Sequence, residues 1–157
     1  MAETCPPSSD TARRGKITRT FGEVTFSSEF DSGNLDRIEA VEREDAGPLS
    51  FLLWTAPDCA GTAFQNGNSS WYYFKVVTQA NFEGNTLRLT IMNLNKQLRL
   101  YQQGFSPIYK TFPGRNRWER LRGSVNVEVS RENAVLLNFV STWVRNSYIH
   151  QSTVCTN

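Results

Sequence analysis

The sequence predicts an all-β fold, an antiparallel β-sandwich of about eight or nine short strands. Three features favour this class. Short runs alternate apolar and polar residues, other runs are rich in aromatic and β-branched side chains, and clusters of Gly, Asn, Asp and Pro separate the runs at regular spacing. The chain has 157 residues, of which 39% are hydrophobic and 20% are charged, and this suits a single globular domain.

The first part of the chain combines a polar leader with β-like segments. Residues 1–16 are rich in Pro, Ser and basic side chains, so we expect a disordered leader there and a sandwich over residues 17–144. Residues 21–26 are β-like, and residues 31–34 predict a turn because Gly and Asn tolerate positive φ. Residues 35–43 fit two structures. Asn34 could cap a helix in which Glu39 and Arg43 form an i,i+4 pair, whereas the pattern on both sides favours a strand.

The later strands are predicted from composition and from the turns between them. Residues 50–55 and 71–78 are runs of apolar, aromatic and β-branched residues, separated by a turn at residues 65–68. Leu87, Leu89 and Ile91 share one face of a strand at residues 86–93. Residues 98–101 are expected as a short strand, residues 125–129 alternate again, and residues 134–144 form the longest apolar element.

Composition excludes several classes of function. A net charge of +2 is too small to indicate nucleic acid, and the apolar runs are shorter than the ~18 residues of a membrane helix, so we expect neither as a partner. The single histidine, His150, excludes a paired-His metal site within this chain, and Cys5, Cys59 and Cys155 form no C-x-x-C motif. We therefore expect no metal ligand or cofactor here, and among enzymes those based on carboxylates alone remain open. No signal peptide is visible, which predicts a cytoplasmic location and free thiols.

Arginines around Trp118 are the first candidate for a binding surface. In a strand, Trp118 and Arg120 would share one face. Guanidinium groups bind carboxylates and phosphates, and a neighbouring Trp adds stacking, so the group predicts a surface for an acidic substrate or a docking domain. The alternative is a solvated sheet edge on which like charges prevent aggregation. The arginines are Arg115, Arg117, Arg120 and Arg122.

A polar segment at the end of the strand at residues 86–93 is the second candidate. Asn93, Asn95 and Lys96 could orient a ligand or a partner loop, or the amides could bond to main chain in a turn, and both interpretations remain open. Two further groups favour structural roles. The aromatic residues at positions 54 and 71–74 are typical of a core, and the carboxylates at positions 42, 44 and 45 lie in a charged loop.

Six motifs that follow one another along residues 26–121 resemble the cytosolic carboxypeptidase family. They are Phe26-Ser-Ser-Glu-Phe-Asp-Ser-Gly-Asn-Leu35, Trp54-Thr-Ala-Pro-Asp-Cys59, Asn66-Gly-Asn-Ser-Ser-Trp-Tyr-Tyr-Phe74, Ile91-Met-Asn-Leu-Asn-Lys-Gln97, Tyr101-Gln-Gln-Gly-Phe-Ser-Pro107 and Arg115-Asn-Arg-Trp-Glu-Arg-Leu121. A weaker match at residues 137–140 extends the resemblance towards Val144. The second of the six motifs points to one branch of the family.

The resemblance implies an N-terminal β-sandwich that precedes a zinc-containing catalytic domain in full-length members. Those members are cytosolic metallocarboxypeptidases that remove glutamates from proteins, above all from tubulin. Residues 145–157 do not match the family, so we expect a chain truncated before the catalytic domain, with a disordered tail. The family's sandwich also has a strand after the first motif, which favours the strand at residues 35–43.

Two hypotheses about function follow. The first is a non-catalytic N-terminal domain of a protein deglutamylase, with the carboxypeptidase domain and glutamate-rich tubulin tails as its partners. The second is a free-standing β-sandwich module that binds acidic peptides or glycans. A reading frame downstream that encodes His-x-x-Glu and a later His would favour the first.

Overall fold

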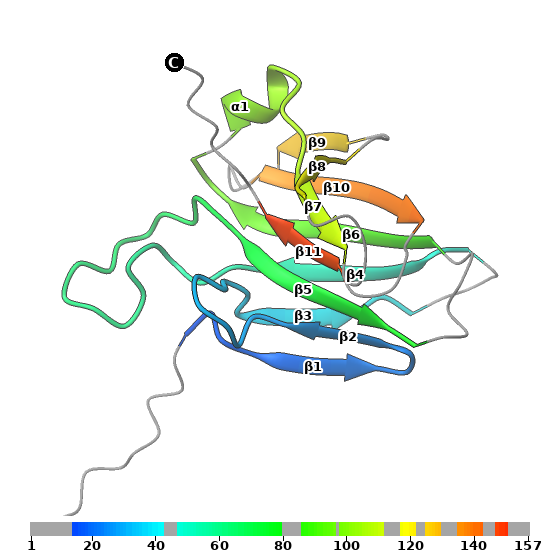
Figure 1. The fold of residues 1–157 in the computed structure, drawn as a ribbon. Coiled ribbons are helices and arrows are strands. Elements are labelled where there is room, and N and C mark those ends of the chain that lie inside the picture. Colours follow the sequence, from blue (N-terminus) through cyan, green and yellow to red (C-terminus); the bar gives the residue numbers. More distant parts are fainter. Residues whose placement is uncertain are drawn as a thin grey trace, which may run out of the picture.

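Two facing β-sheets make up the molecule (Figure 1). A computed structural model of the chain describes residues 14–42, 47–79, 86–96, 98–111, 117–121, 125–129, 135–142 and 147–150. The six-stranded sheet has the order β1 (Thr18–Phe21), β2 (Val24–Ser27), β5 (Tyr73–Thr78), β11 (Ser147–His150), β7 (Ile108–Thr111) and β8 (Glu119–Arg120). The five-stranded sheet has the order β3 (Arg37–Ala40), β4 (Leu49–Trp54), β6 (Thr86–Leu94), β10 (Val135–Thr142) and β9 (Val125–Val129). The predicted all-β sandwich is confirmed, with more strands than the eight or nine expected.

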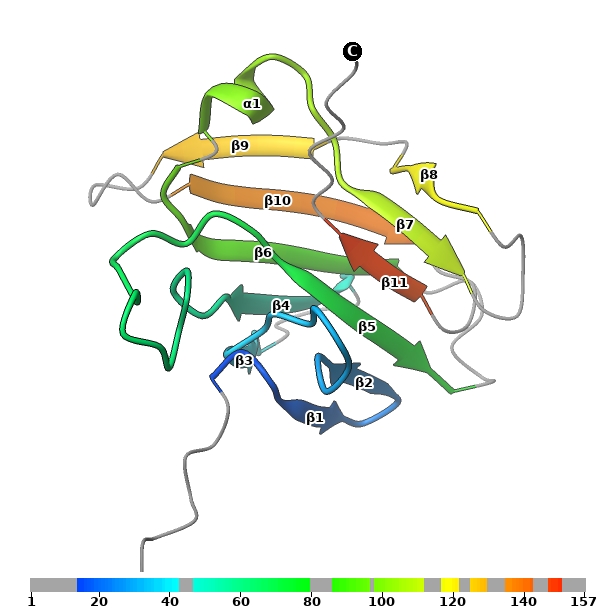
Figure 2. The same cartoon turned by 60° about the vertical axis from the view of Figure 1, so that its left-hand side comes forward.

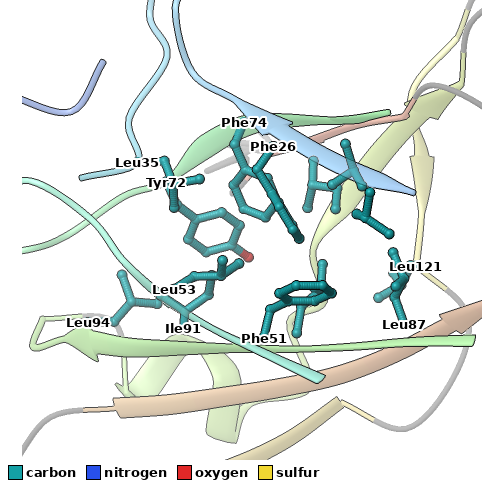
Figure 3. Packing of buried hydrophobic residues seen from close by; sticks show 14 of the residues in the cluster. Phe26, Leu35, Phe51, Leu53, Tyr72, Phe74, Leu87, Ile91, Leu94 and Leu121 are labelled. Carbon is teal, nitrogen blue, oxygen red and sulfur yellow. The ribbon is translucent and has the colours of Figure 1, made fainter. Parts of the chain in front are cut away.

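The core lies between the two sheets (Figure 3), and in β2, β5 and β6 buried residues alternate with more exposed ones. In β6, for example, Leu87, Leu89 and Ile91 are fully buried while the residues between them are at least partly exposed. Aromatic rings join the sheets, since the Phe26 ring of β2 lies 4.8 Å from the Phe51 ring of β4 in an edge-on arrangement. Apolar burial of this kind is the main stabilising contribution to a sandwich.

One strand pair departs from the expected antiparallel arrangement. Every pairing among the described strands is antiparallel except β4 with β6, which runs parallel from Leu49 opposite Leu87 to Leu53 opposite Ile91. The reason is the path of the chain. Between β4 and β6 it crosses to the other sheet as β5, so β6 returns to the first sheet in the same direction as β4.

The disputed segment after Asn34 is a strand, as the family resemblance favoured. Its residues 37–40 form β3, which pairs with β4 from Arg37 opposite Trp54 to Ala40 opposite Phe51. Asn34 does not cap a helix, because its amide is used elsewhere: Nδ2 donates to the Trp71 carbonyl at 3.0 Å and Oδ1 accepts from the Ala56 N–H at 2.9 Å. Long-range pairing thus overrides the local helix signals.

The short strand expected at residues 98–101 is wrong, since these residues form the helix α1 (Leu98–Gln102). The segment contains no glycine, proline or β-branched residue and can therefore coil without penalty. Gly104, at φ +85°, ends the turn and donates its N–H to the Tyr101 carbonyl. The helix buries Tyr101 against the core. Among the described residues, no helix is long and apolar enough to cross a membrane.

Both predicted boundaries of the sandwich need correction. At the N-terminus, Gly15 is buried, donates its N–H to Asp36 Oδ1 at 3.1 Å and accepts from the Leu35 N–H, so the packed structure begins before residue 17. The rest of the predicted leader, residues 1–13, lies outside the described residues.

At the C-terminus, the assignment of residues 145–157 to a tail is corrected for four of them. Ser147–His150 form β11, which pairs with β5 on one side and β7 on the other, and Ile149 is fully buried. The physical reason is that β5 and β7 do not pair with each other, so their main-chain groups require a strand between them. The other residues of the predicted tail lie outside the described residues.

Candidate functional site

The described part of the Arg-rich candidate surface lies on β8 and the two residues before it, at one edge of the six-stranded sheet (Figure 2). Its anchor is the next residue, Leu121, which is buried and donates its N–H to the Pro107 carbonyl at 2.8 Å. Arg117, Trp118 and Arg120 are all exposed. Arg115 and Arg122 lie outside the described residues. The segment is therefore firmly attached and presents two cations and an indole at the sheet edge.

Trp118 ends a short row of aromatic rings. Its ring centroid is 5.9 Å from that of Tyr73 on β5, and Tyr73 lies 4.9 Å from Phe30 in an edge-on contact. Because Phe74 points into the core and side chains alternate along a strand, Tyr73 belongs to the outer face of the sheet. Trp118 is 42% exposed, so part of its indole is accessible to solvent.

Each described arginine of the surface has a contact within the chain. Arg117 Nε donates to Glu119 Oε1 at 3.0 Å, and the Arg120 guanidinium lies 5.5 Å from the Phe105 ring. The Arg117 side chain remains 65% exposed. An ion pair this exposed contributes little to stability, so the guanidinium can exchange Glu119 for a carboxylate of a ligand at small cost.

Asn93 and Asn95, the second candidate, bind main chain within the molecule. Asn93 Oδ1 accepts from the Thr55 N–H and its Nδ2 donates to the Thr55 carbonyl, both at 2.9 Å. Asn95 Oδ1 accepts from the Ser69 N–H at 2.9 Å, and its Nδ2 donates to the Gly67 carbonyl at 2.7 Å. Of the two open interpretations, the contacts favour holding a loop of this chain. Lys96 is exposed beside them.

Two further residues of this network were not identified from the sequence. Asn34 bonds to both Trp71 and Ala56, as described above. Asp58 accepts from the Ser70 N–H at 3.1 Å and from the Ser70 hydroxyl at 2.6 Å. The sequence signals were that Asp58 directly follows Pro57 and that Asn34 belongs to a turn motif. Neither signal predicts a hydrogen-bond partner so distant in the sequence.

The structure does not bring the two candidate groups together. In Figure 2, β8 lies at one end of the sandwich, and the end of β6 with its neighbouring loop lies at the other. Asn93, on β6, and Asn95, directly after it, therefore belong to a different sheet from the Arg-rich surface. The link between the two regions is Tyr73, which contacts Trp118 and pairs with Asn34.

The aromatic residues at positions 54 and 71–74 are largely structural, as expected. Tyr72 and Phe74 are fully buried, and Trp54 is half-buried beneath the Arg37 guanidinium, which lies 4.4 Å from the indole centroid. The Tyr72 hydroxyl is 3.1 Å from the Tyr101 hydroxyl. Burial raises the pKa of both phenols above the ordinary value.

Among the described residues, no group of three or more His, Cys, Asp or Glu side chains is arranged to hold a metal ion. Cys59 is exposed, and Cys5 and Cys155 lie outside the described residues. Of the predicted carboxylate loop, Glu42 is exposed, and Glu44 and Asp45 also lie outside them.

Comparison with protein families decides the identity of this sandwich. Residues 26–146 match the family model of the cytosolic carboxypeptidase N-terminal domain. The chain belongs to the cytosolic carboxypeptidase family. The matched stretch includes all six motifs that carried the resemblance and ends immediately before β11.

Individual members of the cytosolic carboxypeptidase family show the same relationship. The chain is 44% identical over 131 residues to cytosolic carboxypeptidase-like protein 5 of Danio rerio and 41% identical over 142 residues to that of Homo sapiens. It is 36% identical over 87 residues to cytosolic carboxypeptidase 3 of Bos taurus, a match that covers 55% of this chain and 8% of that protein. The like-protein-5 branch is the one to which the Trp54–Cys59 motif pointed.

The matches cover most of this chain but little of its relatives. They span 76% and 78% of the chain, and only 14% and 16% of the Danio rerio and Homo sapiens proteins. The chain thus corresponds to the N-terminal domain of much longer carboxypeptidases.

Proposed function

We propose that this chain is the non-catalytic N-terminal domain of a cytoplasmic zinc carboxypeptidase that removes glutamates from tubulin and other proteins. The observation that carries the proposal is the match of residues 26–146 to the N-terminal domain of the cytosolic carboxypeptidases. The domain packs on the catalytic domain, shapes the entrance to its cleft and helps to hold a glutamate-rich tail. Zinc belongs to the catalytic domain in this proposal.

The exposed surface on β8 supports a role in holding an acidic tail. Arg117 and Trp118 combine positive charge with a partly exposed indole, and among the contacts described above Arg117 is engaged by a weak, exposed ion pair. A tail of glutamates approaching this edge is attracted over about 10 Å at 0.1 M salt, and the attraction fades as salt rises.

A matched pair of arginines makes this proposal testable. Arg117 pairs with Glu119 on β8, and Arg37 pairs with Glu39 on β3, which lies in the other sheet. Both are exposed Arg residues with a Glu two positions later, and they lie in different sheets. Arg37 differs in that its guanidinium also lies over the Trp54 ring. Charge reversal at each site therefore separates a local steering effect from a general change in net charge.

The experiment uses a chimera in which residues 14–150 replace the matching segment of the Danio rerio relative. Arg117→Glu is expected to raise KM for a long glutamate tail several-fold at low salt, with little effect on a short dipeptide-like substrate. Arg37→Glu is expected to leave both KM values nearly unchanged. Equal effects of the two reversals on KM, or equal losses of activity on both substrates, would contradict the steering role. Binding of acidic peptides by the chain alone, with no effect in the chimera, would instead favour a free-standing binding module.

A further inference from the structure

The loop that joins β4 to β5, residues 55–72, projects from the sandwich in both views and is here called the Phe64 loop (Figures 1 and 2). Phe64 is 81% exposed. The other exposed large hydrophobic side chains among the described residues, Val41 and Trp118, are 43% and 42% exposed. A phenyl ring on a projecting loop is accessible to a partner, and aromatic side chains are enriched in protein–protein interfaces.

Hydrogen bonds hold the base of the Phe64 loop on both sides. Asn34, Asn93 and Asn95 connect its main chain to the sandwich, and Asp58 bonds to Ser70 across it. The main chain closes the same base, since the Asp58 N–H donates to the Asn68 carbonyl at 2.7 Å. The loop is long, yet its ends are fixed at many points.

The tip of the loop is also held in one conformation. The Thr62 hydroxyl donates to the Cys59 carbonyl at 2.7 Å and accepts from the Phe64 N–H at 3.1 Å. The Gly61 N–H donates to Gln65 Oε1 at 3.0 Å. Phe64 is thus presented by an ordered backbone, so a partner that binds it does not have to order the loop.

The charge of the loop indicates the chemistry of its partner. Residues 59–70 contain no charged side chain, and the Asp58 carboxylate at the base is hydrogen-bonded to Ser70. A glutamate-rich tail would find no cation on this loop. A neutral loop with an exposed phenyl ring fits an apolar pocket on a folded protein.

The place of this domain in its relatives indicates which folded protein that is. In the relatives, the matched segment is the N-terminal domain, and more than four-fifths of the protein lies outside it.

We propose that the Phe64 loop docks into an apolar pocket of the carboxypeptidase domain that follows this domain in full-length relatives, with Phe64 as the buried anchor. This rests on the proposed function, and it assigns the main contact to the Phe64 loop rather than to the Arg-rich surface. The control site for its test is Val41, an apolar side chain that is exposed at the end of β3.

Cys59 provides a direct probe of whether the loop is covered, because it is an exposed free thiol five residues before Phe64. Its alkylation rate is measured at the Cys59 peptide by mass spectrometry, in the 157-residue chain and in the chimera with the Danio rerio relative. We expect the chimera to alkylate about tenfold more slowly. Phe64→Ser in the chimera is expected to restore the rate of the chain alone, since truncation of a hot-spot aromatic weakens binding by about 30-fold. Val41→Ser is expected to leave the protection intact.

The outcomes separate this inference from the proposed function. An active chimera whose Cys59 reacts as fast as in the chain alone would overturn the docking of the loop and leave the function standing. A chimera that protects Cys59 but releases no glutamate would support docking of the loop and contradict the proposed function. Protection that appears in the chain alone and grows with its concentration would identify a second copy as the occupant, which also overturns the inference. Equal effects of Phe64→Ser and Val41→Ser would remove Phe64 as the anchor.

Discussion

Asn93 bonds to both main-chain groups of Thr55, accepting from its N–H and donating to its carbonyl at 2.9 Å each. Thr55 follows the last residue of β4, and its exposed fraction is 2%. The asparagine amide thus takes the place of a neighbouring strand at the point where β4 ends and the Phe64 loop begins. A residue that the sequence marked as a candidate ligand contact is instead part of the frame of the domain.

Asn93→Ala should lower the free energy of unfolding by about 2–4 kcal/mol. The change removes the hydrogen bonds of the amide to Thr55 and Ser69. It leaves the buried N–H and carbonyl of Thr55 without this partner, which costs more than an average hydrogen bond contributes. Urea unfolding of the 157-residue chain measures the effect. Lys96→Ala, an exposed change three residues later, is the control and should change the free energy of unfolding by less than about 0.5 kcal/mol. Equal effects of the two variants would contradict the role given to Asn93.

Gly33→Ala should destabilise the fold by at least about 2 kcal/mol, because a Cβ at this position would lie 2.1 Å from the Ser28 carbonyl oxygen. The turn after β2 leaves no space there. Gly67→Ala is the matched control, since a Cβ at position 67 meets no atom within 4 Å. Thermal unfolding of both variants checks the prediction, and a Gly33 variant as stable as the Gly67 variant would refute the close approach.

The buried tyrosine pair should make stability fall at alkaline pH. Burial raises the pKa of Tyr72 and Tyr101 in the folded state, while in the unfolded chain both ionise near pH 10. Above that pH the unfolded state holds fewer protons than the folded state, so each phenol lowers the free energy of unfolding by up to about 1.4 kcal/mol per pH unit. Below pH 10 the contribution is fully retained.

Variants isolate this effect from other alkaline changes. Tyr72→Phe and Tyr101→Phe, singly and together, should each reduce the loss of stability between pH 9 and pH 11, as measured by urea midpoints. If the double variant loses as much stability over that range as the unchanged chain, the phenols are not the titrating groups.

Strands with local signals were predictable, and features made by distant pairing were not. β6 was found from its alternating leucines, because burial of one face imposes a period of two on the sequence itself. β11 carries no such signal. Its four residues became a strand because β5 and β7 supply main-chain partners on both sides, and Ile149 fills a position in the core.

The candidate site likewise combines features that the local sequence predicts with features that depend on distant contacts. Exposure of Arg117 and Trp118 agrees with a surface role that their composition suggested. For Asn93 and Asn95 the sequence left two interpretations open, because an amide serves a ligand and a main chain equally well. Their partners, Thr55, Gly67 and Ser69, lie between 26 and 38 residues away, and local patterns hold no information at that range.

Glutamate release from a glutamylated peptide tests the central claim most directly, when kcat/KM is compared among three proteins. These are the 157-residue chain, the Danio rerio relative without its matching segment, and the chimera that carries residues 14–150 in that place. We predict no release by the chain alone, weak release by the shortened relative, and recovery in the chimera of most of the activity of the intact relative. Release by the chain alone that a chelator abolishes, or full activity of the shortened relative, would contradict the account.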